Sequence, residues 1–276
     1  MSSPTPGTQQ PDADQQQAES VDLKPVEAAF AAALAALLIH WAAVKAAWVT
    51  DLVGQVGQSA ADDDIAGFGR LELDSSHAAN IVHDALTAYA SVAAAHVVAE
   101  AHEQGVQGVQ PVVPDDDDLA AQAAVAAALL AAALATSAGS EAVRVHRPGR
   151  DSNDGAPTIP PSTPAKTQQA VREHLDGLTD TQVVYVLGGA LTGAQNAARV
   201  LTLVGAGSDV AVIASEVNDA HICIPCEEIH GRRLKDFGSN DWSQVFAAYP
   251  VRGYINCLGR DRCRGTVVGL WQKEST

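Results

Sequence analysis

Apolar residues recur at spacings of three or four along the first half of the chain, as one face of a helix requires. The first run predicts a helix over residues 21–58, with a stripe formed by Phe30, Leu34, Leu37, Trp41, Val44, Trp48 and Leu52. A second run predicts a helix that is capped by Asp74, Ser75 or Ser76 and extends to Gly105. Its apolar side contains Ile81, Leu86, Tyr89, Val92 and Val97.

Four consecutive aspartates, Asp115–Asp118, precede a third apolar run over residues 119–145. Carboxylates are favourable at the positive end of a helix dipole, so the pattern predicts a helix start. A metal site is the alternative interpretation. We favour the helix start because consecutive residues point in different directions around a helix.

The pattern changes at residues 146–166, where five prolines are interspersed with Gly, Ser, Asn and Thr. This composition predicts a stiff, exposed linker and the main domain boundary. Two further helices are expected over residues 167–178 and 180–204. Alternating β-branched residues at 209–217 then predict a strand.

The composition supports a mainly α fold. Hydrophobic residues make up 47% of the 276 residues but aromatic residues only 4%, and much of the apolar content is alanine. Alanine favours helices while burying little area. We therefore predict a disordered tail (1–20), an Ala-rich long-helix domain (21–145), the linker, and a C-terminal domain (167–276) of helices with a small zinc-stabilised α+β module at 210–270.

Charge divides the chain unevenly. The net charge is −16, yet the segment from His221 onward holds eight Lys/Arg and six Asp/Glu, against nine and 27 in the preceding 220 residues. An acidic surface disfavours nucleic-acid binding by the whole chain. The uncharged stretches 28–44 and 119–140 raise the question of a membrane span. We expect none, because alanine partitions only weakly into lipid.

All four cysteines lie near the C-terminus, as Cys223-Ile-Pro-Cys226 and as Cys257 and Cys263. A C-x₂-C turn places two thiolates on one cation, and a second pair completes a tetrahedron, the closed arrangement of structural Zn²⁺. The five-residue gap in the second pair is wider than usual. Two disulfides, a redox pair and inert buried thiols remain alternatives.

Two histidines, His221 and His230, flank the first cysteine pair, and His230 is a reserve ligand. Four thiolates would leave no coordination position for water, so we expect a structural site and assign no catalytic residue. A catalytic zinc would need an open position and a base such as Glu227 or Glu228. The chain contains no G-x-S-x-G, H-E-x-x-H or Walker A motif.

Five arginines lie close to the cysteines in the sequence: Arg232, Arg233, Arg260, Arg262 and Arg264. Such residues can contact phosphates or a partner protein. The alternative is that they balance the thiolate charge or pair with nearby aspartates.

These motifs resemble the C-terminal half of the phage head morphogenesis family, the Mu F-like minor head proteins, in the form found in phages of actinobacteria. The resemblance covers residues 180–276 and rests on a knuckle, a Tyr-Pro turn and a closing Cys-Arg-Gly-Thr. The matching residues are Asp219, Cys223, Cys226, Gly231, Tyr249, Pro250, Gly253, Tyr254, Cys257, Cys263, Arg264, Gly265 and Thr266. His230 and Arg252 depart from the family pattern, which has Asp and Gly there.

The resemblance implies a virion component assembled in the host cytoplasm. Such proteins bind portal and major capsid or scaffold protein, assist procapsid assembly, and affect DNA packaging or delivery. We expect a non-enzymatic assembly protein that also associates with itself. A capsid maturation protease and a nucleic-acid-binding zinc module that contacts phage DNA are the alternatives.

Overall fold

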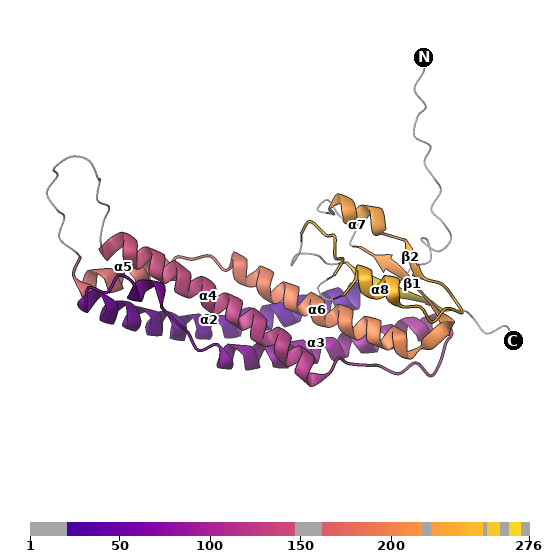
Figure 1. Ribbon diagram of the computed structural model, residues 1–276. Coiled ribbons are helices and arrows are strands. Elements are labelled where there is room, and N and C mark those ends of the chain that lie inside the picture. The colour runs from indigo at the N-terminus through magenta and orange to yellow at the C-terminus, as the bar shows by residue number, and fades with distance from the viewer. Residues whose placement is uncertain (1–20, 147–161, 217–221, 251–252, 260–264, 272–276) are drawn as a thin grey trace, which may run out of the picture. The chain divides into compact units, whose positions relative to one another are not determined.

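The computed structural model describes residues 21–146, 162–216, 222–250, 253–259 and 265–271. It is mainly helical, with a three-stranded sheet and two short helices near the C-terminus (Figure 1). The predicted fold class is confirmed. The predicted tail at 1–20 lies outside the described residues, as do 147–161 of the predicted linker.

Three long helices occupy the first half of the chain: α2 (Lys24–Ala61), α3 (Ser76–Glu103) and α4 (Asp116–His146). Each lies close to its predicted bounds. Asp74 Oδ1 accepts a hydrogen bond from the Ser76 N–H at 2.9 Å, as expected of a residue that caps α3. The aspartate run lies in the first turn of α4, so the helix-start interpretation is confirmed.

By length and composition, α2, α3 and α4 are each apolar enough to cross a membrane. Within the most apolar window of each helix, 17%, 39% and 44% of the residues are buried by the protein. The expectation of no membrane span therefore stays a prediction.

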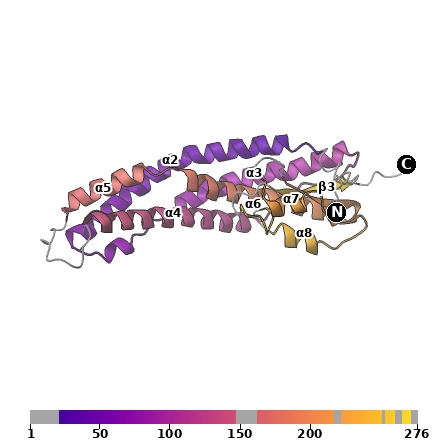
Figure 2. The same ribbon diagram turned by 90° about the horizontal axis from the view of Figure 1, so that it is seen from above.

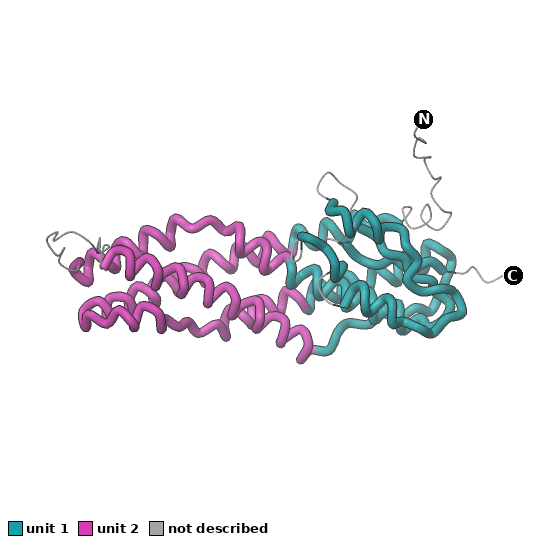
Figure 3. Tube along the Cα trace, turned by 45° about the horizontal axis from the view of Figure 1, so that its top comes forward, with its two compact units in different colours: residues 1–32, 87–115, 189–276 teal, residues 33–86, 116–188 magenta. Residues whose placement is uncertain are grey.

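The chain forms two compact units (Figure 3). Unit 2 contains residues 33–86 and 116–188, and unit 1 contains the rest. The predicted boundary at 146–166 differs from this division, because the helix that follows it, α5 (Pro164–Asp176), packs against α4. Ser137 Oγ lies 2.9 Å from His174 Nε2, and the Ser162 N–H donates to the His146 carbonyl at 3.0 Å.

Backbone segments approach one another closely in the interior of unit 2. The 3₁₀ turn η1 (Gly67–Gly69) lies directly on α4 at Gly139. A Cβ atom on Gly139 would lie 2.1 Å from the Phe68 carbonyl oxygen. Much of the buried face of α4 is alanine, including Ala123, Ala127 and Ala138. Small side chains thus set the spacing between backbones in this unit.

Unit 1 contains the sheet. The chain continues from α6 (Thr181–Gly205) through η2 (Gly207–Asp209), β1 (Val210–Ser215), α7 (Ile224–Ile229), β2 (Arg233–Lys235), α8 (Ser243–Ala248) and β3 (Thr266–Trp271). The strand order is β2-β1-β3, and both pairings are antiparallel. Every residue of β1 and β3 is buried, and β1 confirms the strand predicted from alternation.

Side chains cover the outer edge of β3, which lies beside the end of α3 (Figures 1 and 2). On this edge, alternate backbone groups point away from β1. Four of these groups are paired with side chains. Asn196 Nδ2 donates to the Gly265 carbonyl (3.1 Å), and Arg199 Nε donates to the Val267 carbonyl (2.9 Å). Gln104 makes the other two hydrogen bonds: its Nε2 donates to the Gly269 carbonyl (3.0 Å), and its Oε1 accepts from the Trp271 N–H (3.0 Å).

A fully buried ion pair lies behind this edge. Arg199 Nη2 and Glu100 Oε1 are 2.6 Å apart, and His96 Nδ1 lies 2.8 Å from the same carboxylate oxygen. Burial alone would raise the pKa of Glu100, but the charge of Arg199 and hydrogen bonds from His96 and Arg199 hold the pKa below its ordinary value. The pair therefore ties α3, α6 and β3 together in its ionised form.

Candidate metal centre

Three of the four cysteines form one cluster in unit 1. The Sγ atoms of Cys223, Cys226 and Cys257 all lie within 4.8 Å of one another, and those of Cys223 and Cys257 are 3.8 Å apart. Cys226 and Cys257 are buried and Cys223 is partly buried. The predicted convergence of the C-x₂-C pair with Cys257 is thus observed. Cys263 lies outside the described residues.

The start of α7 places the first two thiols. Cys223 is the N-cap residue, with extended backbone angles, and Pro225 occupies the first turn, where its missing N–H costs no helical hydrogen bond. Cys226 follows in the same turn, so both sulfurs lie at the N-terminal end of α7. Pro225, inside the C-x₂-C motif, therefore favours a helix start at this point.

A separate turn brings in the third thiol. The Cys257 N–H donates to the Tyr254 carbonyl at 3.0 Å, and the Gly259 N–H points at Cys257 Sγ at 3.3 Å. Tyr254 also packs against the thiol cluster. Backbone amides directed at sulfur are the expected environment of a thiolate that ligates a metal.

The cluster favours ionisation of Cys223. Burial alone would raise the pKa of this thiol. Hydrogen bonds from the backbone N–H groups of Cys226 and Leu258, together with those from the thiols of Cys226 and Cys257, outweigh burial and lower the pKa to about 7. A thiolate is the form that binds metal ions.

The sulfur spacing fits a tetrahedral cation. A Zn²⁺ ion with Zn–S bonds of about 2.3 Å at the centre of a sulfur tetrahedron separates each pair of sulfurs by about 3.8 Å. The distance from Cys223 Sγ to Cys257 Sγ has this value. Three thiols of the predicted set can therefore hold a metal ion, and the donor type suits a soft or borderline cation such as zinc.

His230, the reserve ligand, is positioned for another role. Its Nδ1 accepts a hydrogen bond from the Glu216 N–H at 3.0 Å, which leaves the proton of a neutral ring on Nε2. Among the described residues, the cluster contains neither this histidine nor an acidic residue. Glu227 and Glu228, the predicted alternative bases, are exposed on α7.

Two of the five arginines near the cysteines lie among the described residues. Arg232 is exposed, whereas Arg233 lies 3.3 Å from Asp236 and over the ring of Phe237. For Arg233, pairing with a nearby aspartate, the alternative to phosphate contact, is therefore observed. The other three, Arg260, Arg262 and Arg264, lie outside the described residues.

Sequence reasoning missed a buried polar contact beside the cluster. Tyr249 Oη donates to Glu216 Oε1 at 2.5 Å, and both side chains are buried. The same carboxylate lies against Gly265, where an added Cβ would be 2.0 Å from both oxygens. Tyr249 and Gly265 stood out as motif residues, but their shared partner is distant in sequence, so no local pattern indicated it.

Comparison of the chain with protein-family models, with curated proteins and with solved structures gives no significant match.

Proposed function

We propose that the thiol cluster is a structural zinc centre that holds the C-terminal module in one conformation. Cys223, Cys226 and Cys257 would supply three ligands, and Cys263 the fourth. The 3.8 Å sulfur spacing and the lowered pKa of Cys223 support this assignment. A bound ion would cross-link the start of α7 to the turn that contains Cys257.

A structural role is favoured over a catalytic one. Four thiolates fill the tetrahedron and leave no position for an activated water. Glu227 and Glu228 point to solvent rather than join the thiol group. No observation on the described residues favours the protease alternative.

We further propose that the protein is a virion component of the phage head morphogenesis type, which contacts portal and capsid or scaffold protein during procapsid assembly. The proposal rests on the motif order in the C-terminal module. Four of the motif residues are held by backbone conformation or packing. Gly231 and Gly253 adopt positive φ angles of 77° and 80°, Tyr249 is buried, and Gly265 has no room for a side chain. The fold thus constrains these four motif residues, which supports the proposal.

The metal assignment is tested by elemental analysis of the reduced full-length protein. We expect about one zinc per chain, and loss of that zinc in Cys257→Ser. The neighbouring Asn256→Ser is a matched control, because Asn256 is exposed and lies outside the cluster. A metal-free wild-type protein with unchanged stability would refute the zinc centre.

The assembly role is tested by co-expression with the portal protein of the same phage. We expect co-purification of the two proteins, and its loss in Cys257→Ser but not in Asn256→Ser. Failure of the wild type to retain portal or capsid protein would contradict the assembly role and leave the metal centre intact. Salt-sensitive DNA binding without portal binding would favour the nucleic-acid alternative.

A further inference from the structure

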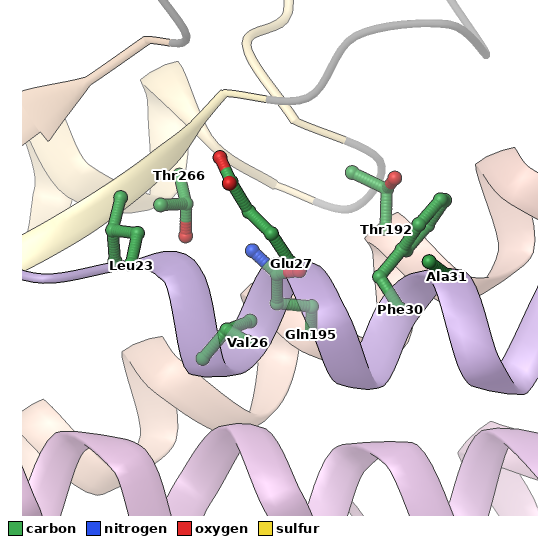
Figure 4. A pocket seen from close by; sticks show the side chains of 8 residues that line it. All are labelled: Leu23, Val26, Glu27, Phe30, Ala31, Thr192, Gln195 and Thr266. Carbon is green, nitrogen blue, oxygen red and sulfur yellow. The ribbon is translucent and has the colours of Figure 1, made fainter.

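A cavity of about 270 Å³ lies in unit 1, and none of the three clustered cysteines lines it, so it is independent of the proposed zinc centre. Figure 4 shows side chains from three elements around it. The lining includes Val26, Glu27 and Phe30 of α2, Thr192 and Gln195 of α6, and Thr266 of β3. The cavity is slightly smaller than the range of about 300–1,000 Å³ that is usual for drug-sized ligands.

One polar group in the lining lacks a partner. Thr266 is 2% exposed, and its hydroxyl has no hydrogen bond within the described part of the protein. A buried hydroxyl without a partner is costly, with a typical penalty of about 1–3 kcal/mol. A ligand that hydrogen-bonds to Thr266 Oγ1 would remove this penalty.

A second polar group is held in a fixed orientation. The Tyr89 hydroxyl donates to Gln195 Oε1, so the amide nitrogen of Gln195 is the atom left to face the cavity, as Figure 4 shows. Tyr89 is itself 2% exposed and packs edge-on against Phe30, with ring centroids 5.9 Å apart. The polar end of the cavity is therefore built on a buried aromatic support.

Among the described residues of the lining, one side chain is ionisable. This is Glu27, which is exposed to solvent and forms no ion pair with another described residue. The remaining walls are mostly apolar. Such a surface complements a cationic group on a short apolar stem, because the carboxylate pairs with the cation and Phe30 offers a ring to the stem or the charge.

We propose that this cavity binds a small organic cation, an ammonium or guanidinium group on an apolar stem. The head group donates to the Glu27 carboxylate and to Thr266 Oγ1, and the stem packs against Val26 and Phe30. The chemistry is shared by a free amine and by a lysine or arginine side chain of a polypeptide. The size of the cavity suits either source.

Titration calorimetry on the full-length protein tests the assignment, with phenethylammonium as the free-amine probe. We expect it to bind several-fold more tightly than its uncharged analogue 2-phenylethanol. Because Glu27 is exposed, Glu27→Gln should weaken phenethylammonium binding by about two- to five-fold. Glu103→Gln, which removes the same charge from an exposed position of unit 1 outside the lining, should not.

Thr266→Val separates binding from folding. The substitution removes a hydroxyl that has no protein partner, so the melting temperature should not fall, while phenethylammonium binding should weaken several-fold.

N-acetylargininamide forms the second arm of the experiment. Tighter binding of this compound identifies a polypeptide side chain as the source, and tighter binding of phenethylammonium identifies a free amine. Binding of neither probe, or equal binding to wild type and Glu27→Gln, would overturn the proposal.

Discussion

The two compact units bury their interiors by different means. In unit 2, alanine and glycine let backbones approach until no side chain fits between Gly139 and Phe68. In unit 1, the sheet is joined to its surroundings through polar contacts: an ion pair, side chains on a strand edge, and converging thiols. The effect of a substitution in unit 2 should therefore depend on the change in side-chain volume. In unit 1 it should depend on whether a polar partner is lost.

Loss of the sulfur cluster should have the largest effect. Metal binding to small zinc modules contributes about 10–16 kcal/mol to their folding. In Cys226→Ser, or after chelation, we expect residues 222–259 to exchange amide hydrogens rapidly while residues 116–146 stay protected. Peptide-resolved hydrogen exchange measures both regions at once. Unchanged exchange of residues 222–259 after chelation would show that the cluster does not hold the module.

Breaking the buried ion pair should have the next largest effect. Arg199→Met leaves the Glu100 carboxylate buried without its partner, which typically costs about 3–5 kcal/mol. Urea unfolding measures the loss. Arg70→Met is a matched control, because Arg70 pairs with Asp64 and both side chains are largely exposed, so we expect almost no change there. Similar effects of the two substitutions would contradict the contrast.

The pH dependence of stability should also change in the same variant. In the wild type the folded pKa of Glu100 is lowered, so its contribution is complete above the unfolded pKa of about 4.3 and is lost as the pH falls through the folded value. Without Arg199, His96 is the remaining contact that opposes the effect of burial, so the folded pKa of Glu100 should rise relative to the wild type and the loss of stability on acidification should begin at a higher pH. Urea midpoints between about pH 2.5 and 6 measure both slopes. Parallel slopes would argue against the ionised pair.

A volume change in unit 2 should have a smaller effect. In Gly139→Ala the added Cβ meets the Phe68 carbonyl oxygen, and overpacking of this kind costs about 1–3 kcal/mol. Gly54→Ala makes the same change on α2, where no atom lies within 4 Å. It should stabilise the protein by about 0.5–1 kcal/mol through helix propensity. Thermal unfolding separates the two, and a loss in both would count against the close approach as the cause.

The long helices could be predicted from the sequence because their signals are local. Apolar spacing sets the face of α2, and Asp74 and the aspartate run indicate where α3 and α4 begin. The cysteine cluster was predictable for the same reason, since a C-x₂-C spacing fixes two thiols in one turn. Prolines gave a misleading domain boundary, because they report the local chain and not the packing of α5 on α4.

The contacts that define unit 1 could not be predicted in this way. Asn196 reaches the Gly265 carbonyl across 69 residues, and Tyr249 reaches Glu216 across 33. Neither partner is marked by periodicity or by composition. The strand β3 was also missed, because its six buried residues show no alternation. Non-local pairing of polar side chains is thus the part that only the folded structure reveals.

The paired outer edge of β3 has a consequence for how copies of this protein meet. An open strand edge is a template on which another chain can extend the sheet, and repeated extension leads to aggregates. Here Gln104, Asn196 and Arg199 already hydrogen-bond to three carbonyls and one N–H on this edge, and an incoming strand would have to displace them. Extension of the sheet along β3 would therefore first have to break these four hydrogen bonds.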